Sequence, residues 1–373
     1  MDDAAANQQT SASPPGVLSE IPRYGAQIPP AIGPDAGAMS RYFPDGIPRL
    51  NSALFAITLL TTTMAGAYVA GADLSLRNPI DFVVGLGSGL SFSLPLMGIL
   101  LAHEMGHYLT ARRYGVNTSL PYFLPAPFPS VFFIGTFGAF IRMRQMPQTR
   151  RVMFDIGAAG PWAGMIVAVP CLILGLHLSD IQPLSSQGAG GLELGNSILF
   201  YGLSRWMLGV DPNLVNVNLS PLAFAGWLGL LVTTLNLLPV GQFDGGHVVY
   251  ALSPRHHRRI STIFVVGCVL MVVIPLAIGR GFWGGWMLWA VIAIAIGLGH
   301  PSTVDRDAPL GRGRTIAAWL TVALFIVTFM PKPISISAPE ENGPQPQNSQ
   351  TYDVMLHAPA AGNAQLHRAA SRI

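Results

Sequence analysis

The chain has 373 residues, of which 50% are hydrophobic and only 10% are charged, and its formal net charge is +3. A water-soluble domain of this size could not readily bury a chain whose mean hydropathy is +0.45. The arginines are spread over several loops and form no single basic patch, so nothing indicates nucleic-acid binding. Composition therefore predicts an integral membrane protein in contact with a lipid bilayer.

Three regions follow one another along the chain. Residues 1–49 carry no apolar run and are predicted to be a disordered N-terminal region, without a signal peptide. Residues 50–331 are predicted to form one transmembrane domain, and residues 332–373 a disordered C-terminal tail. Apolar runs near the length that crosses a hydrocarbon core of about 30 Å predict an all-α polytopic membrane protein with about six to seven transmembrane helices. They are expected at residues 50–70, 82–111, 154–178, 219–238, 260–278, 282–298 and 315–330.

The distribution of arginines predicts the topology. The loops after the second, fourth and sixth expected spans hold most of them, whereas the alternate loops hold mainly Arg77, Arg205 and Arg280. The positive-inside rule places the N-terminus and the arginine-rich loops in the cytoplasm, and the C-terminal tail outside if there are seven spans. Twenty arginines and one lysine favour a bacterial source over a plastid, and thus the bacterial cytoplasmic membrane.

The second expected span contains the sequence HEMGH, with His103, Glu104 and His107. Residues four apart in a helix differ by about 40° around the axis and about 6 Å along it, so both histidines can reach one metal ion. Glu104 points about 100° away from His103, which suits a carboxylate that takes a proton from a metal-bound water. Gly106 is expected to leave room for a substrate backbone. The pattern is that of zinc hydrolases, although hydrogen bonding of these side chains at the membrane edge is an alternative.

A third metal ligand is expected because two histidines do not complete a zinc site. The best candidate is Asp244, which follows the fourth expected span. This span ends on the same side of the membrane as HEMGH, so Asp244 is expected at a similar depth. Pro239 and neighbouring glycines interrupt the helix here, and broken backbone at membrane depth is tolerated only where protein or a cavity covers it. The alternative is that Asp244 only caps the next helix.

Two other stretches have unusual patterns. Residues 128–144 are apolar but too short and too rich in glycine to span a bilayer, which predicts either a re-entrant segment or an interfacial loop. Residues 154–165 begin the third expected span with small side chains, which favour close helix packing. The other histidines have no defensible ligand spacing to HEMGH. His256 and His257 are assigned to the basic loop, and His247 is noted because it lies near Asp244.

HEMGH together with the later sequence NLLPVGQFDGG resembles the paired motifs of the site-2 protease family of intramembrane zinc metalloproteases. The resemblance covers roughly residues 95–252 and is closest to the compact type, without a PDZ or regulatory domain. It implies one Zn²⁺ ion bound by His103, His107 and Asp244, with Glu104 as the general base. It also implies that Asn236 steadies the substrate or the oxyanion.

The resemblance further implies that residues 128–144 form a short re-entrant β hairpin beside the site. A hairpin could bind an unwound substrate as an added strand, through Gly135, Thr136, Phe137 and Gly138. The expected substrate is a single-span transmembrane protein, cut within or near its membrane helix in regulated intramembrane proteolysis. The oligomeric state is left open.

Two other functions are kept as alternatives. A catalytically unused relative could act as a membrane scaffold or chaperone, in which case changing Glu104 would leave its effect intact. A multispan transporter could use the histidines and aspartate for proton or metal passage, but repeated halves or charges in several spans are expected of it and are not seen.

Overall fold

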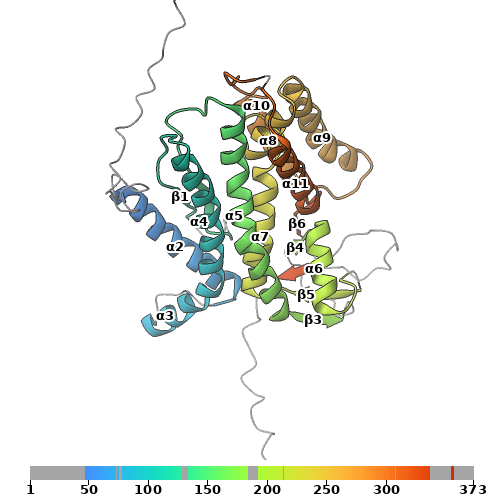
Figure 1. The fold of residues 1–373 in the computed structure, drawn as a ribbon. Helices are drawn as coiled ribbons and strands as arrows, with labels where there is room; N and C mark the ends of the chain where they lie inside the picture. Colours follow the sequence, from blue (N-terminus) through green and yellow to red (C-terminus); the bar gives the residue numbers. More distant parts are fainter. Residues whose placement is uncertain are drawn as a thin grey trace, which may run out of the picture.

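The computed structural model describes residues 47–72, 74, 78–127, 133–183, 192–212, 214–306, 308–336 and 354–356, which are predominantly helical (Figure 1). Three described helices are long and apolar enough to cross a membrane: α2 (Arg49–Val69), α5 (Arg150–His177) and α9 (His257–Ala277). A fourth is obtained if α3 (Pro79–Ser88) and α4 (Leu90–Arg113) are taken as one span with a 46° bend. The chain is therefore a helical membrane protein with three or four candidate spans in its described part.

The count of six to seven transmembrane helices is not confirmed, because three expected spans are short helices. They are α7 (Pro221–Asn236) with 16 residues, α10 (Gly285–Ile296) with 12 and α11 (Arg312–Thr328) with 17. About 20 residues are needed to cross the hydrocarbon core without help from neighbouring segments. Helix-breaking residues set these limits, since Pro221 begins α7 at its first position and Gly284 and Gly297 bound α10.

The second expected span is divided at Gly89, between α3 and α4. A β-carbon at Gly89 would lie 1.9 Å from the carbonyl oxygen of Thr63 in α2, so only glycine allows the two backbones to meet. Asn78 caps α3 by accepting a hydrogen bond from the backbone N–H of Ile80. The expected single helix is thus two helices, joined by a bend at Gly89 where the chain contacts α2.

Helices α4, α5 and α7 pack side by side in the centre of the molecule (Figure 1). Small residues let their backbones touch, as expected for residues 154–165: a β-carbon on Gly106 would lie 2.5 Å from the carbonyl oxygen of Ala159. The expectation that Gly106 leaves room for a substrate was therefore wrong, because α5 fills that space. A β-carbon on Gly175 would similarly meet the backbone of Ala223, at 2.1 Å.

An antiparallel hairpin lies against α2 and is formed by β1 (Tyr122–Pro125) and β2 (Thr136–Phe140). Tyr122 pairs with Phe140, and the register shifts between Leu124 and Pro125. The hydroxyl of Thr61 in α2 donates a hydrogen bond of 2.7 Å to the Gly135 carbonyl. Residues 128–132 lie outside the described part of the chain. A hairpin is thus present, and its entry into the membrane stays a prediction.

Other strands were missed by the all-α prediction. Between α5 and α7 the chain forms β3 (Asp180–Pro183), β4 (Leu192–Leu194), the helix α6 (Ile198–Leu208) and β5 (Val215–Asn218). Strand β3 pairs with β5, and β4 pairs with both β6 (Ile334–Ile336) and β7 (Val354–Leu356). These strands have three or four residues, too few for an alternating pattern to be visible. The expected C-terminal tail therefore has structure at β6 and β7, and residues 1–46 of the expected N-terminal region lie outside the described residues.

Candidate metal centre

Two buried histidines of α4 bring their ring nitrogens together. His103 and His107 lie one turn apart, and their Nε2 atoms are separated by 3.1 Å. The Nδ1 atom of His107 is 2.7 Å from the carbonyl oxygen of Ile156 in α5. A carbonyl only accepts, so Nδ1 must carry the proton and the Nε2 lone pair is left for a cation. The expected i, i+4 arrangement is therefore present, with one ring fixed by the neighbouring helix.

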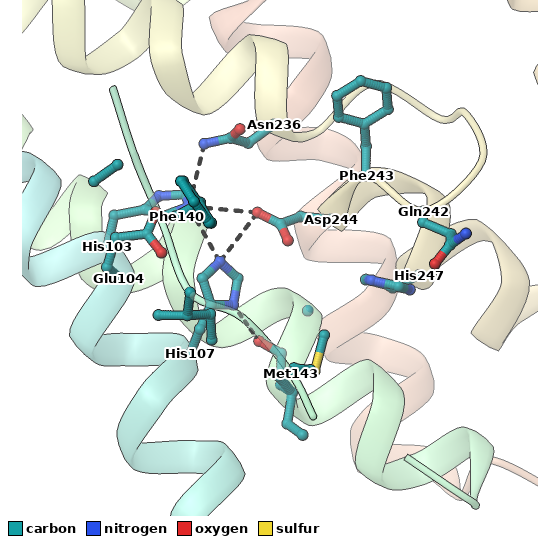
Figure 2. A pocket seen from close by; sticks show the side chains of 14 residues that line it. His103, Glu104, His107, Phe140, Met143, Asn236, Gln242, Phe243, Asp244 and His247 are labelled. Carbon is teal, nitrogen blue, oxygen red and sulfur yellow. Dashed lines mark hydrogen bonds and ion pairs between the residues drawn. The ribbon is translucent and has the colours of Figure 1, made fainter. Parts of the chain in front are cut away.

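The third side chain comes from α8 (Asp244–Leu252), which begins at Asp244. Its Oδ2 atom is 3.4 Å from His103 Nε2 and 3.2 Å from His107 Nε2 (Figure 2). The loop after α7 turns sharply to allow this, with Gly241 at a φ of 51°. Gly245 lies so close to α7 that a β-carbon would be 2.0 Å from the Leu237 carbonyl oxygen. Asp244 thus begins a helix, as its alternative interpretation held, and also faces the histidines.

The three ligand atoms have the spacing that a tetrahedral metal ion requires. Ligand bonds of about 2.0–2.1 Å at tetrahedral angles place two ligand atoms about 3.3 Å apart. Within the described residues, these atoms form a group in which all lie within 4.8 Å of one another. Two imidazole lone pairs and a carboxylate repel one another unless a cation or proton lies between them. The residues present therefore fit a divalent metal with nitrogen and oxygen ligands.

Helix α5 supplies the space that the histidines occupy. A β-carbon on Gly160 would lie 2.1 Å from His107 Nε2, and one on Gly164 would lie 3.3 Å from His103 Nδ1. No other residue type leaves the His107 ring where it is. The small residues that begin the third expected span therefore do more than pack helices, because they also position the candidate metal ligands.

Glu104 and Asn236 lie beside the three ligands, as expected from the sequence (Figure 2). Glu104 is buried, and Ile141, directly after β2, lines the cavity beside it. Asn236 ends α7, and its Nδ2 atom is 3.2 Å from His103 Nε2. Neither side chain belongs to the ligand group, so a carboxylate and an amide remain available to a substrate or a water molecule.

These side chains line a cavity of about 240 Å³ whose other wall is the hairpin. Gly135, Thr136, Phe137 and Gly138, the expected substrate-binding residues, do not line it. The Thr136 hydroxyl donates to the carbonyl of Leu124 in the partner strand, at 2.8 Å. Sequence reasoning instead missed the residues that line the cavity after Gly138 and around α5 and α8, which are Ala139, Phe140, Ile141, Met143, Ile156, Gly157, Gln242 and Phe243. A role of residues 135–138 in binding stays a prediction.

Bundled helices around a candidate His₂Asp metal site, with a free carboxylate and an adjoining cavity, are the arrangement of a membrane protein with a hydrolytic metal centre. The model of peptidase family M50 matches residues 91–278, about half of the chain, including both motifs. The chain belongs to peptidase family M50, the site-2 protease family.

Several plant proteins are similar to this chain. "Probable zinc metalloprotease EGY1, chloroplastic" is 37% identical over 48% of the chain and 31% of its own length in Arabidopsis thaliana. The Oryza sativa subsp. japonica protein of that name is 37% identical over 65% of the chain and 41% of its own length. "Probable zinc metalloprotease EGY2, chloroplastic" of Oryza sativa subsp. indica is 32% identical over 51% of the chain and 34% of its own length. The chain thus spans about a third to two fifths of these relatives, and no solved structure matches it.

Proposed function

We propose that the chain is a zinc-dependent intramembrane endopeptidase that hydrolyses peptide bonds within or near the membrane helix of a single-span protein. The observation that carries the proposal is the convergence of His103 Nε2, His107 Nε2 and Asp244 Oδ2, with distances of 3.1–3.4 Å, beside the buried Glu104. The family match and the names of the similar plant proteins support zinc as the metal.

His103, His107 and Asp244 would hold one Zn²⁺ ion. When bound, zinc acts as a Lewis acid and lowers the pKa of a coordinated water toward about 7. Glu104 lies in the same cavity and can take a proton at its carboxylate and pass it to the leaving nitrogen. Ile141, the residue directly after β2, lines the same cavity, so the end of the hairpin lies beside the base.

Asn236 can donate from Nδ2 to the substrate carbonyl oxygen as negative charge develops there, because it lies within 3.2 Å of a ligand nitrogen. The cavity wall formed by Ala139 and Phe140 is the last part of β2, and an unwound substrate segment could pair with this strand. Unwinding is required because the backbone of a membrane helix is fully hydrogen-bonded internally.

The proposed location is a bacterial cytoplasmic membrane, with the site toward the cytoplasm. Arg314 at the start of α11 contacts Asp155 near the start of α5, at 2.8 Å, and its Nη2 atom is 3.3 Å from the hydroxyl of Tyr114 at the end of α4. These three helix ends belong to the arginine-rich side that the positive-inside rule assigns to the cytoplasm.

The test is cleavage of a panel of single-span reporter proteins by the purified chain in detergent. The expected result is a cut within or near the reporter's span that is lost in Glu104→Gln, lost with a chelator, and regained with added zinc. Glu104→Gln keeps the side-chain volume and should keep zinc, so metal content measured on both proteins separates loss of the base from loss of the site. Equal inactivity of both zinc-loaded proteins would contradict the proposal.

That same negative result would favour the scaffold alternative, since the site would then be loaded but unused on these reporters. A multispan transporter predicts proton or metal flux that does not need Glu104 as a base. Reconstituted vesicles with an internal pH or zinc indicator measure this flux directly, and we expect none above empty vesicles.

A further inference from the structure

A second set of histidines begins at the edge of the metal cavity. His247, one turn after Asp244 in α8, lines the cavity without belonging to the ligand group. Its Nδ1 atom is 2.8 Å from Nε2 of His300, in the segment after α10. In the view of Figure 2, His247 lies beyond Asp244 from His103 and next to Gln242. The proposed mechanism gives this buried side chain no role.

The hydrogen bonds of this set fix which ring nitrogens carry protons. His300 Nδ1 is 2.7 Å from the carbonyl oxygen of Pro301, and a carbonyl only accepts, so Nδ1 of His300 must donate. In a neutral ring the other nitrogen, Nε2, is then an acceptor. His247 Nδ1 must therefore donate to it, which leaves Nε2 of His247 as an unprotonated acceptor.

The His300 ring is itself held in a neutral, ordered state. It stacks on Tyr250 with ring centroids 4.1 Å apart and an interplanar angle of 16°. The Tyr250 hydroxyl in turn accepts a hydrogen bond of 3.0 Å from the backbone N–H of Thr303. Burial also lowers the pKa of His300 below its ordinary value, which favours the neutral ring.

Nε2 of His247 has no hydrogen-bond partner among the described residues. It is also not fully buried, unlike the unpartnered ring nitrogens of His257. The atom therefore retains access to the cavity that its side chain lines. In this tautomer Nε2 presents a lone pair, so toward a peptide it can accept a hydrogen bond and cannot donate one. A substrate peptide offers one donor per residue, the backbone N–H, whereas its carbonyl oxygen needs a donor such as Asn236.

We propose that His247 is a substrate-positioning residue whose Nε2 accepts a hydrogen bond from a backbone N–H of the substrate near the scissile bond, with His300 fixing its tautomer. The inference rests on the proposed function for the identity of the substrate. His247 would add a hydrogen-bond acceptor to a site in which Asn236 donates to the peptide and Glu104 acts as the general base. His300, which does not line the cavity, acts only through His247.

The test measures peptide binding, so that it does not depend on turnover. The full chain carrying Glu104→Gln is titrated with a fluorescent transmembrane peptide and with analogues in which one backbone N–H at a time is replaced by an ester oxygen. One analogue should bind about tenfold more weakly than the parent, the scale of one lost hydrogen bond in a buried site. In Glu104→Gln, His247→Leu the parent should be weakened to the same degree, and that analogue should lose nothing further.

Three further variants complete the design. His247→Gln places an amide oxygen near the lost acceptor and should recover most of the affinity. His300→Phe keeps the stack on Tyr250, removes the acceptor for His247 and should weaken the parent peptide several-fold. His177→Leu makes the same exchange at an exposed histidine at the far end of α5 and should change nothing.

The inference would be overturned if the ester analogue and His247→Leu each lowered the peptide affinity and the two losses added in combination. Loss of zinc in His247→Leu would overturn it as well. Failure of the proposed function gives a different pattern. The wild type would then leave the reporters uncut, while the ester analogue and His247→Leu would still weaken peptide binding without adding.

Discussion

His103 and His107 direct two Nε2 atoms toward one point beside Asp244, whereas His247 and His300 form a line in which one ring donates to the next. In each pair a backbone carbonyl holds one Nδ1 proton, that of Ile156 for His107 and that of Pro301 for His300. What differs is the group beyond Nε2. In the first pair, each Nε2 faces the Asp244 carboxylate and the lone pair of the other ring, an arrangement that a metal ion stabilises. In the second pair, Nε2 of His300 faces the Nδ1–H of His247 and accepts a hydrogen bond from it. The function of each pair is therefore set by the backbone group that holds one of its Nδ1 protons as much as by spacing in the sequence.

The largest effect is expected from removing the charge at the centre of the converging group. Asp244→Ala should lower zinc affinity by more than about 100-fold, since the loss of an outer-sphere partner alone costs about 10- to 100-fold. Zinc content by atomic emission and cleavage of the reporter measure this, and both should fall to background. His300→Phe should retain its zinc, and loss of zinc there would show that the two groups are one unit.

Glu104→Gln separates catalysis from metal binding within the first group. Cleavage should fall by about 10²- to 10⁴-fold, the usual contribution of a general base, while one zinc per chain is retained. Single-turnover cleavage with excess enzyme gives the rate directly. A variant that keeps more than a tenth of the wild-type rate would remove Glu104 from the proton transfer.

Gly160→Ala tests the space behind His107. The added methyl would meet His107 Nε2 at 2.1 Å and must displace the ring, so zinc affinity should fall about 10- to 100-fold. Competition with a chromophoric chelator measures the affinity. Gly267→Ala in α9 is the matched control, because a β-carbon there meets nothing within 4 Å. Equal affinities in the two variants would contradict the role assigned to α5.

Asp155→Asn should have the smallest effect, because it weakens a partly exposed ion pair outside both histidine groups. Arg314 donates to both carboxylate oxygens of Asp155, at distances of 2.8–3.0 Å. Loss of the charge should lower the free energy of unfolding by about 1 kcal/mol or less. Thermal unfolding in detergent measures the shift, and zinc content should not change. A loss of zinc here would connect the cytoplasmic helix ends to the site.

The convergence of the three candidate metal ligands could be predicted from the sequence because their geometry is local or strongly marked. His103 and His107 need only one turn of helix, and Asp244 follows a visible break at Pro239 and Gly241. The residues that hold them could not be found this way, since the Ile156 carbonyl and Gly160 reach His107 only after α5 packs on α4. His257 was assigned to the basic loop, yet it is buried at the start of α9.

The limits of the helices were predicted less well than their existence. The apolar runs correctly indicated α2, α5 and α9, but composition does not register a bend such as that at Gly89, which depends on contact with Thr63. Residues 135–138 illustrate a similar limit. The resemblance suggested that they bind the substrate as part of a hairpin, while the pairing of β1 with β2 places the next residues, Ala139 and Phe140, on the cavity.

The bend at Gly89 has a mechanical consequence for a protein embedded in lipid. None of the residues of α3 is buried, although the helix contacts α2 and α4, whereas α4 is packed against α2, α5 and α7. A bilayer that is too thin or too thick exerts its force on lipid-facing segments, and tilting them costs only fractions of a kcal/mol per Å of mismatch. The short arm α3 can therefore absorb a change in membrane thickness at its pivot. The candidate ligands on α4, about 21–27 Å further along the helix axis, would keep their spacing in membranes of different composition.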